Sequence, residues 1–203
     1  MGRVKSWIKF RTRKNFSLTQ EKLEERLLDL DKTKDDFEAI SVFAMCYAPT
    51  ARMWMPDVTQ KATCNGCGKE LEITSSPGPG YDGNVLSAYN GLAREYQELG
   101  YDARINCYCD KCVRKMGLPS LDHGQTNVFF AFRPKDVEEY HLTPLTTNSY
   151  YSDELKMVLE FLKGASSYKD LDKDYNGRPS SLFNTADDFR DCIERILGVE
   201  IPQ

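Results

Sequence analysis

Two cysteine-rich stretches organise this sequence: Cys64-Asn65-Gly66-Cys67-Gly68-Lys69 and Cys107-Tyr108-Cys109-Asp110-Lys111-Cys112. Each contains a Cys-x-x-Cys pair, and two intervening residues allow a tight turn to direct both sulfurs at one ion. Gly68 directly follows a sulfur and suits a turn that needs positive φ. The spacing therefore predicts a metal site with four ligands: Cys64, Cys67, Cys109 and Cys112.

Zinc is the metal that this ligand set favours. Four thiolates around Zn²⁺, each at about 2.3 Å, form a closed structural site without an open position for substrate. An iron–sulfur cluster is an alternative, because Cys107 supplies a fifth cysteine for four positions, and a redox dithiol is another. Only Cys109–Cys112 repeats the spacing of the first pair, so we expect Cys107 on a strand that enters the second turn.

The two pairs resemble, at the level of the motif, the zinc-ribbon or treble-clef type of zinc-binding module over residues 61–115. Zinc ribbons separate their pairs by about 15–20 residues, whereas residues 68–108 intervene here. The resemblance therefore implies a zinc-ribbon-like site with a helical insertion, in which zinc has a structural role.

The composition is that of a globular protein with an uneven distribution of charge. Charged residues make up 29% of the chain and hydrophobic residues 40%, which are ordinary values for such proteins. No apolar run approaches the roughly 20 residues of a membrane span. Because we find no secretion signal and expect free cysteines, we predict a reducing, cytoplasmic location.

The N-terminus is a basic arm on an acidic body. Residues 1–14 contain no acid, and the net charge of the whole chain is −4. The arm could bind nucleic acid or another anion, contact an anionic membrane peripherally, or lie on the acidic body. Its candidate binding residues are Arg3, Lys5, Lys9, Arg11, Arg13 and Lys14.

Apolar periodicity predicts about five helices. The expected start signals are Ser17, Thr33 together with Asp36, Asn84, Ser152 and Thr185. The expected stops are Gly100, Gly164 and Gly198. The apolar positions Leu23, Leu27 and Leu30 predict the buried face of the first helix. The first two helices would form an antiparallel hairpin. Gly91, inside the third helix, indicates a close packing contact.

Alternation and β-branched or aromatic clusters predict antiparallel strands at residues 70–74, 101–107, 127–133 and 137–142. The fold class is therefore α+β. We expect four parts: a basic arm (1–16), a helical hairpin (17–60), a zinc-binding module (61–118) and an α+β C-terminal part (119–203). An alternative is that the C-terminal part forms one compact domain with the rest.

A second metal loop is not expected. Residues 172–177 match the first half of an EF-hand loop, but Phe183 stands where a bidentate Glu is required. No calcium affinity tighter than millimolar is predicted for this loop.

Conventional catalytic motifs are absent from the sequence, and His123 and His141 are the only histidines. We therefore favour a non-catalytic zinc protein that acts as an interaction or assembly module, and the sequence leaves open whether its partner is a protein or a nucleic acid. Two alternatives remain open. One is a nucleic-acid-binding protein that uses the basic arm, and the other is an enzyme with a pocket near the Phe-rich strand, tested at His123 or Cys107.

Overall fold

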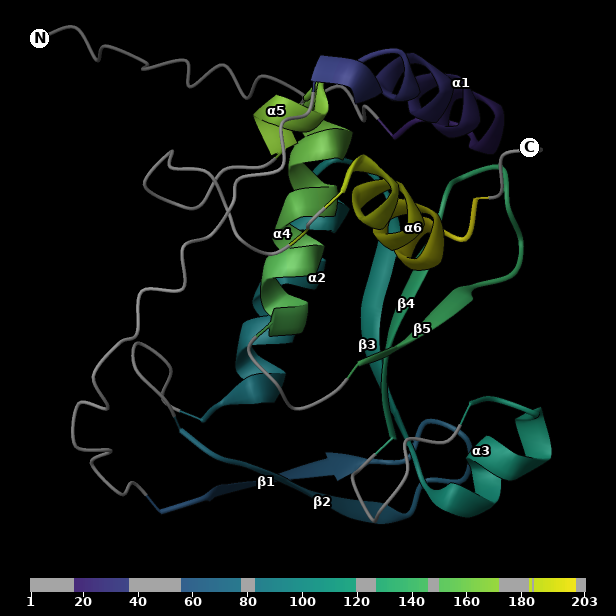
Figure 1. The fold of residues 1–203 in the computed structure, drawn as a ribbon. Helices are drawn as coiled ribbons and strands as arrows, with labels where there is room; N and C mark the ends of the chain where they lie inside the picture. The colour runs from purple at the N-terminus through teal and green to yellow at the C-terminus, as the bar shows by residue number, and fades with distance from the viewer. Residues whose placement is uncertain are drawn as a thin grey trace, which may run out of the picture.

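A three-stranded antiparallel sheet and a separate two-stranded hairpin make up the β structure of the described residues (Figure 1). The computed structural model describes residues 17–36, 56–77, 83–119, 127–145, 150–171, 183 and 185–199. The helices are α1 (Gln20–Asp31), a 3-10 turn η1 (Lys34–Asp36), α2 (Val85–Glu98), α3 (Asp110–Met116), α4 (Tyr150–Lys163), α5 (Tyr168–Leu171) and α6 (Ala186–Leu197). The strands are β1 (Val58–Thr63), β2 (Glu70–Ser75), β3 (Asp102–Tyr108), β4 (Asn127–Arg133) and β5 (His141–Leu145). The predicted α+β class is confirmed.

The three-stranded sheet has the order β3-β4-β5, and both pairs are antiparallel. Successive side chains along a strand point to opposite faces of the sheet. Val128, Phe130 and Phe132 of β4 therefore point to one side, and Phe129 points to the other. Both sides of β4 are buried, which explains its nearly continuous apolar sequence.

Three helices cover the Phe130 side of the sheet, as Figure 1 shows for α2, α4 and α6. Tyr96 of α2 meets Phe130 and Phe132 edge to face, at ring-centroid distances of 5.0 and 6.0 Å. Such pairs stabilise by about 0.5–1.5 kcal/mol beyond their buried area. Leu155 and Val158 of α4 are fully buried in the same core cluster.

Capping side chains fix several helix ends at the positions that the sequence indicates. Thr185 and Asp188 form the predicted capping box of α6, and Gly198 ends that helix with φ 65°. Asn84 accepts from the backbone N–H of Ser87 at the start of α2. Leu23, Leu27 and Leu30 form the buried face of α1, as expected.

Other helix predictions are wrong. Thr19, not Ser17, caps α1, because its hydroxyl accepts from the N–H of Lys22. α4 begins at Tyr150, so Ser152 lies inside it. A Cβ at Gly91 would have no atom within 4 Å, so this glycine marks no close contact.

The edge strand also differs from the prediction of residues 137–142. β5 is His141–Leu145, because β4 is followed by a turn in which Arg133 donates to the carbonyl of Glu138. Pro144 fits this edge position, where a strand can lack one donor. Residues 37–47, predicted as the second helix of a hairpin, and the basic arm lie outside the described residues.

Candidate metal centre

The first cysteine pair lies in the turn that connects β1 to β2. These strands pair from Val58↔Ser75 to Thr63↔Glu70. Beyond the last pair, Cys64 donates its N–H to the carbonyl of Lys69, and Gly68 donates to the carbonyl of Cys64. Gly68 has φ 76°, as its position after the second sulfur predicts. The backbone therefore bends tightly enough to place two sulfurs on one side of the turn.

The second pair lies where β3 passes into α3. Cys109 is the N-cap residue, and Cys112 is in the first turn of the helix. Cys112 and Val113 both donate their N–H groups to the carbonyl of Cys109. A helical turn thus presents both sulfurs on the same side as the turn between β1 and β2.

The structure brings the four predicted cysteines together. The Sγ atoms of Cys64, Cys67, Cys109 and Cys112 all lie within 4.8 Å of one another. The Sγ atoms of Cys67 and Cys109 are 3.7 Å apart. Four sulfurs at about 2.3 Å from one tetrahedral ion would be separated by about 3.8 Å. The cluster can therefore hold a metal ion.

Asn65 joins the two turns independently of any metal. Its backbone N–H donates to the carbonyl of Cys107 at 2.8 Å. Its side-chain Oδ1 accepts from the N–H of Cys107 at 2.7 Å. Nothing in the sequence singles out Asn65, because its contact depends on how the hairpin packs against β3. The two turns are consequently held in register before an ion binds.

Gly66 allows the turns to approach each other closely. A Cβ at this position would lie 2.8 Å from the Sγ of Cys112 and 3.1 Å from its Cβ. Any larger residue would have to displace a sulfur of the cluster. The glycine is thus a steric requirement of the cysteine arrangement.

Backbone N–H groups stabilise the thiolate of Cys64. Burial raises the pKa of this thiol, but hydrogen bonds from the N–H groups of Cys109, Gly66 and Cys67 outweigh burial and lower the pKa to about 6. The N–H of Cys109 lies 3.3 Å from the Sγ of Cys64. Metal binding requires thiolates, so these donors favour the ligand form.

Without a cation, the same proximity opposes ionisation of all four sulfurs. The Cys112 thiol donates to its neighbours, first to Cys109, and together with burial these hydrogen bonds raise its pKa to about 12. A divalent ion at the centre would replace these shared protons and neutralise part of the thiolate charge.

Cys107 does not belong to the cluster. It lies on β3, as predicted, and side chains alternate along a strand, so it points into the main core with Val128 and Phe130. Burial, with a smaller contribution from Cys64, raises its pKa to about 11. Cys107 is therefore a buried thiol behind the cluster.

The cluster packs on the sheet face opposite the main core. Cys64, Cys112 and Val113 form a small buried cluster with Tyr108 and Phe129. The rings of Tyr108 and Phe129 meet edge to face at 5.7 Å. In Figure 1 the hairpin and α3 lie together at one end of the sheet, away from α1 and α5.

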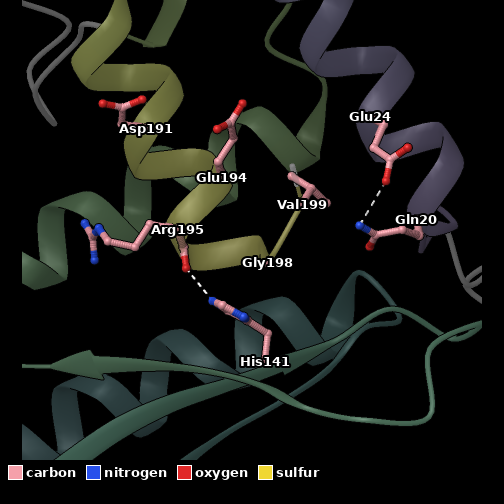
Figure 2. A pocket seen from close by; sticks show the side chains of 8 residues that line it. All are labelled: Gln20, Glu24, His141, Asp191, Glu194, Arg195, Gly198 and Val199. Atoms are coloured by element: carbon pink, nitrogen blue, oxygen red, sulfur yellow. Dashed lines mark hydrogen bonds between the residues drawn. The ribbon is translucent and has the colours of Figure 1, made fainter. Parts of the chain in front are cut away.

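His141 has a structural contact in this fold. It lines an open hollow of about 540 Å³ between α1, α6 and β5, shown in Figure 2, and its Nε2 donates to the carbonyl of Arg195 at 2.6 Å. No residue of the Phe-rich strand β4 lines this hollow. His123, the basic arm and residues 172–182 lie outside the described residues.

Comparison of the chain with protein-family models, with curated proteins and with solved structures finds no match. Among the described helices, none has both the length and the apolar composition needed to cross a bilayer.

Proposed function

We propose that Cys64, Cys67, Cys109 and Cys112 bind one structural zinc ion, and that the chain is a non-catalytic interaction or assembly module. The observation that carries this proposal is the sulfur cluster, whose Cys67–Cys109 separation of 3.7 Å matches a tetrahedral single-ion site. All four positions would be filled by protein ligands, which leaves none for a substrate.

The surrounding structure supports a treble-clef-like form of this site. One ligand pair comes from a β-hairpin turn and the other from the first turn of a helix. A multinuclear iron–sulfur cluster would need room for several iron and sulfide atoms, whereas sulfurs within 4.8 Å of one another fit a single ion.

The small apolar core of the β1–β2 hairpin supports a structural role for the metal. Ile73 is the only large apolar side chain of β1 or β2 that is fully buried. An isolated two-stranded hairpin is marginally stable at best. Zinc would therefore fix β1–β2 and α3 to the sheet and leave their polar outer surfaces available to a partner. Six free thiols among the described residues suit a reducing compartment such as the cytoplasm.

Elemental analysis of the purified protein tests the proposal. We expect about one zinc per chain, no stoichiometric iron or sulfide, and loss of the zinc in a Cys64→Ser variant. The matched control is Cys107→Ala, which removes the neighbouring cysteine that lies outside the cluster and should retain zinc. A metal-free protein, or one iron per chain, would rule out the zinc assignment.

A further inference from the structure

Three basic side chains occupy one side of α3. Lys111, Arg114 and Lys115 are all exposed and follow the spacing i, i+3, i+4, which makes them neighbours on a helix surface. Lys69, just beyond the hairpin turn, is exposed as well. We call Lys69, Lys111, Arg114 and Lys115 the basic edge of the metal centre.

Among the described residues, no carboxylate lies in ion-pair contact with the basic edge. Many other lysines of the chain do have such partners. The pairs are Lys32–Asp29, Lys34–Asp187, Lys61–Glu70, Lys156–Asp153 and Lys163–Glu160.

Internal countercharge does not cancel the basic edge. The only acid of α3, Asp110, keeps its negative charge, because its hydrogen-bond partner at 2.8 Å is the neutral side-chain amide of Asn127. A zinc ion with four thiolates would carry a net charge of about −2, so that site and Asp110 together would offset about three of the four positive charges. An excess of positive charge therefore remains on this surface.

A further exposed base lies on the adjoining sheet. Arg104 is exposed and pairs with Ala131, one row from Phe129, on the sheet face that carries the metal centre. Its guanidinium lies 4.2 Å from the ring centroid of Tyr140. No described carboxylate forms an ion pair with Arg104. Its charge does help to lower the pKa of Asp102, but the ion pair of that carboxylate is with Arg133, at 2.6 Å.

We propose that the basic edge and Arg104 bind the phosphodiester backbone of a nucleic acid. This inference deepens the proposed function by naming the partner of the module, and it rests on that function because the metal positions α3. Arginine binds phosphate bidentately and lysine binds it as a point charge. Contacts of this kind do not read sequence, so the binding is independent of base sequence.

An anionic membrane fits this surface less well. Met116 is the only large apolar side chain that α3 exposes, and the helix has 7 residues. Interfacial helices bind membranes through a continuous apolar face that enters the lipid. The surface around the metal centre offers charge for phosphate contacts and little apolar area for insertion.

Fluorescence anisotropy with labelled single-stranded DNA and RNA tests the proposal on the full, zinc-loaded chain. Each phosphate contact contributes about −0.7 to the slope of log K against log salt concentration. The variant Lys111→Gln/Arg114→Gln/Lys115→Gln should therefore bind at least about tenfold more weakly at low salt, with a slope shallower by about 2.

The matched control removes the same charge elsewhere. Lys22, Lys135 and Lys169 are exposed and lie on α1, in the β4–β5 turn and on α5. Their triple Gln variant should keep the affinity within about twofold and the slope of the parent. Zinc content is measured for every variant, and Arg114→Gln/Lys115→Gln replaces the triple variant if substitution of Lys111 displaces the metal.

Three results would overturn the proposal. The first is that the parent protein binds neither nucleic acid at low salt. The second is that the α3 variant binds like the parent, with an unchanged salt slope. The third is that phosphatidylserine vesicles bind this surface and nucleic acid does not. A failure of the proposed function is distinguished by elemental analysis, because a parent protein without zinc would refute the metal site whatever the titration shows.

Discussion

Replacing Cys64 by Ser in the zinc-loaded protein should release the β1–β2 hairpin while the sheet stays folded. The Sγ of Cys64 accepts the N–H of Cys109, and the side chain is 2% exposed, so no water can replace it without local opening. The sheet has its own core, in which Phe130 and Phe132 are fully buried. Loss of metal should therefore act locally.

The size of the expected change in amide exchange depends on the zinc energy that is lost and on the contacts that still hold the hairpin. The two Asn65–Cys107 hydrogen bonds contribute about 1 kcal/mol each, and burial of Ile73 contributes about 1.5–3 kcal/mol. Zinc contributes about 10–16 kcal/mol in small zinc peptides. If only a quarter of that energy stabilises the hairpin, amide exchange in β1 and β2 should accelerate by about one hundred- to one thousand-fold.

Hydrogen exchange read by mass spectrometry, with zinc content measured in parallel, checks this expectation. Peptides from β1 and β2 should lose protection in Cys64→Ser, and those from β4 should not. Cys107→Ala, the control, should leave both patterns and the zinc unchanged. A Cys64→Ser protein that keeps a full complement of zinc, with a hairpin that exchanges as slowly as before, would contradict this expectation.

Three further predictions concern stability and affinity. Asn65→Ala should weaken zinc binding about tenfold, as measured by chelator competition, because it removes a contact that orients the turns. Asn65→Asp keeps the acceptor oxygen, so its zinc affinity should stay near that of the parent protein. Arg26→Met should cost about 1.5–3 kcal/mol in urea unfolding, because its guanidinium donates to the carbonyls of Phe161 and Leu162 in the last turn of α4. An unchanged midpoint would contradict this. Burial raises the pKa of Asp102, but hydrogen bonds from Tyr140 and Arg133 lower it overall. The carboxylate therefore stabilises the fold above about pH 4, and this stabilisation is lost as the pH falls through the lowered pKa. In acid unfolding, the stability of Asp102→Asn should not show this pH-dependent decrease.

The parts of the fold that the sequence predicts are those whose signals are local. The capping box of Thr185 and Asp188 depends on residues three apart, and the Leu23, Leu27 and Leu30 face depends on one helical period. The two cysteine pairs are likewise local patterns. Their meeting across residues 68–108 was a prediction from ligand chemistry.

The parts that sequence reasoning missed depend on tertiary context or on elements too short for periodicity. α3 has only 7 residues, which is too short for an apolar period to show in the sequence. Asp110 at its start and Gly117 at its end are ordinary helix signals that could have indicated it. Strand β1 has a weakly apolar sequence and exists through its pairing with β2. The contact of Asn65 with Cys107 follows from the packing of the hairpin on β3.

The close approach of Gly66 to Cys112 has a consequence for recognising relatives of this chain. Since a side chain at this position would push against a ligand sulfur, diverged sequences that keep the site should read Cys-x-Gly-Cys at the first pair and tolerate more change at the second. A search pattern built on that asymmetry, with a long and variable spacer, would select this arrangement from the many proteins that merely contain two Cys-x-x-Cys pairs.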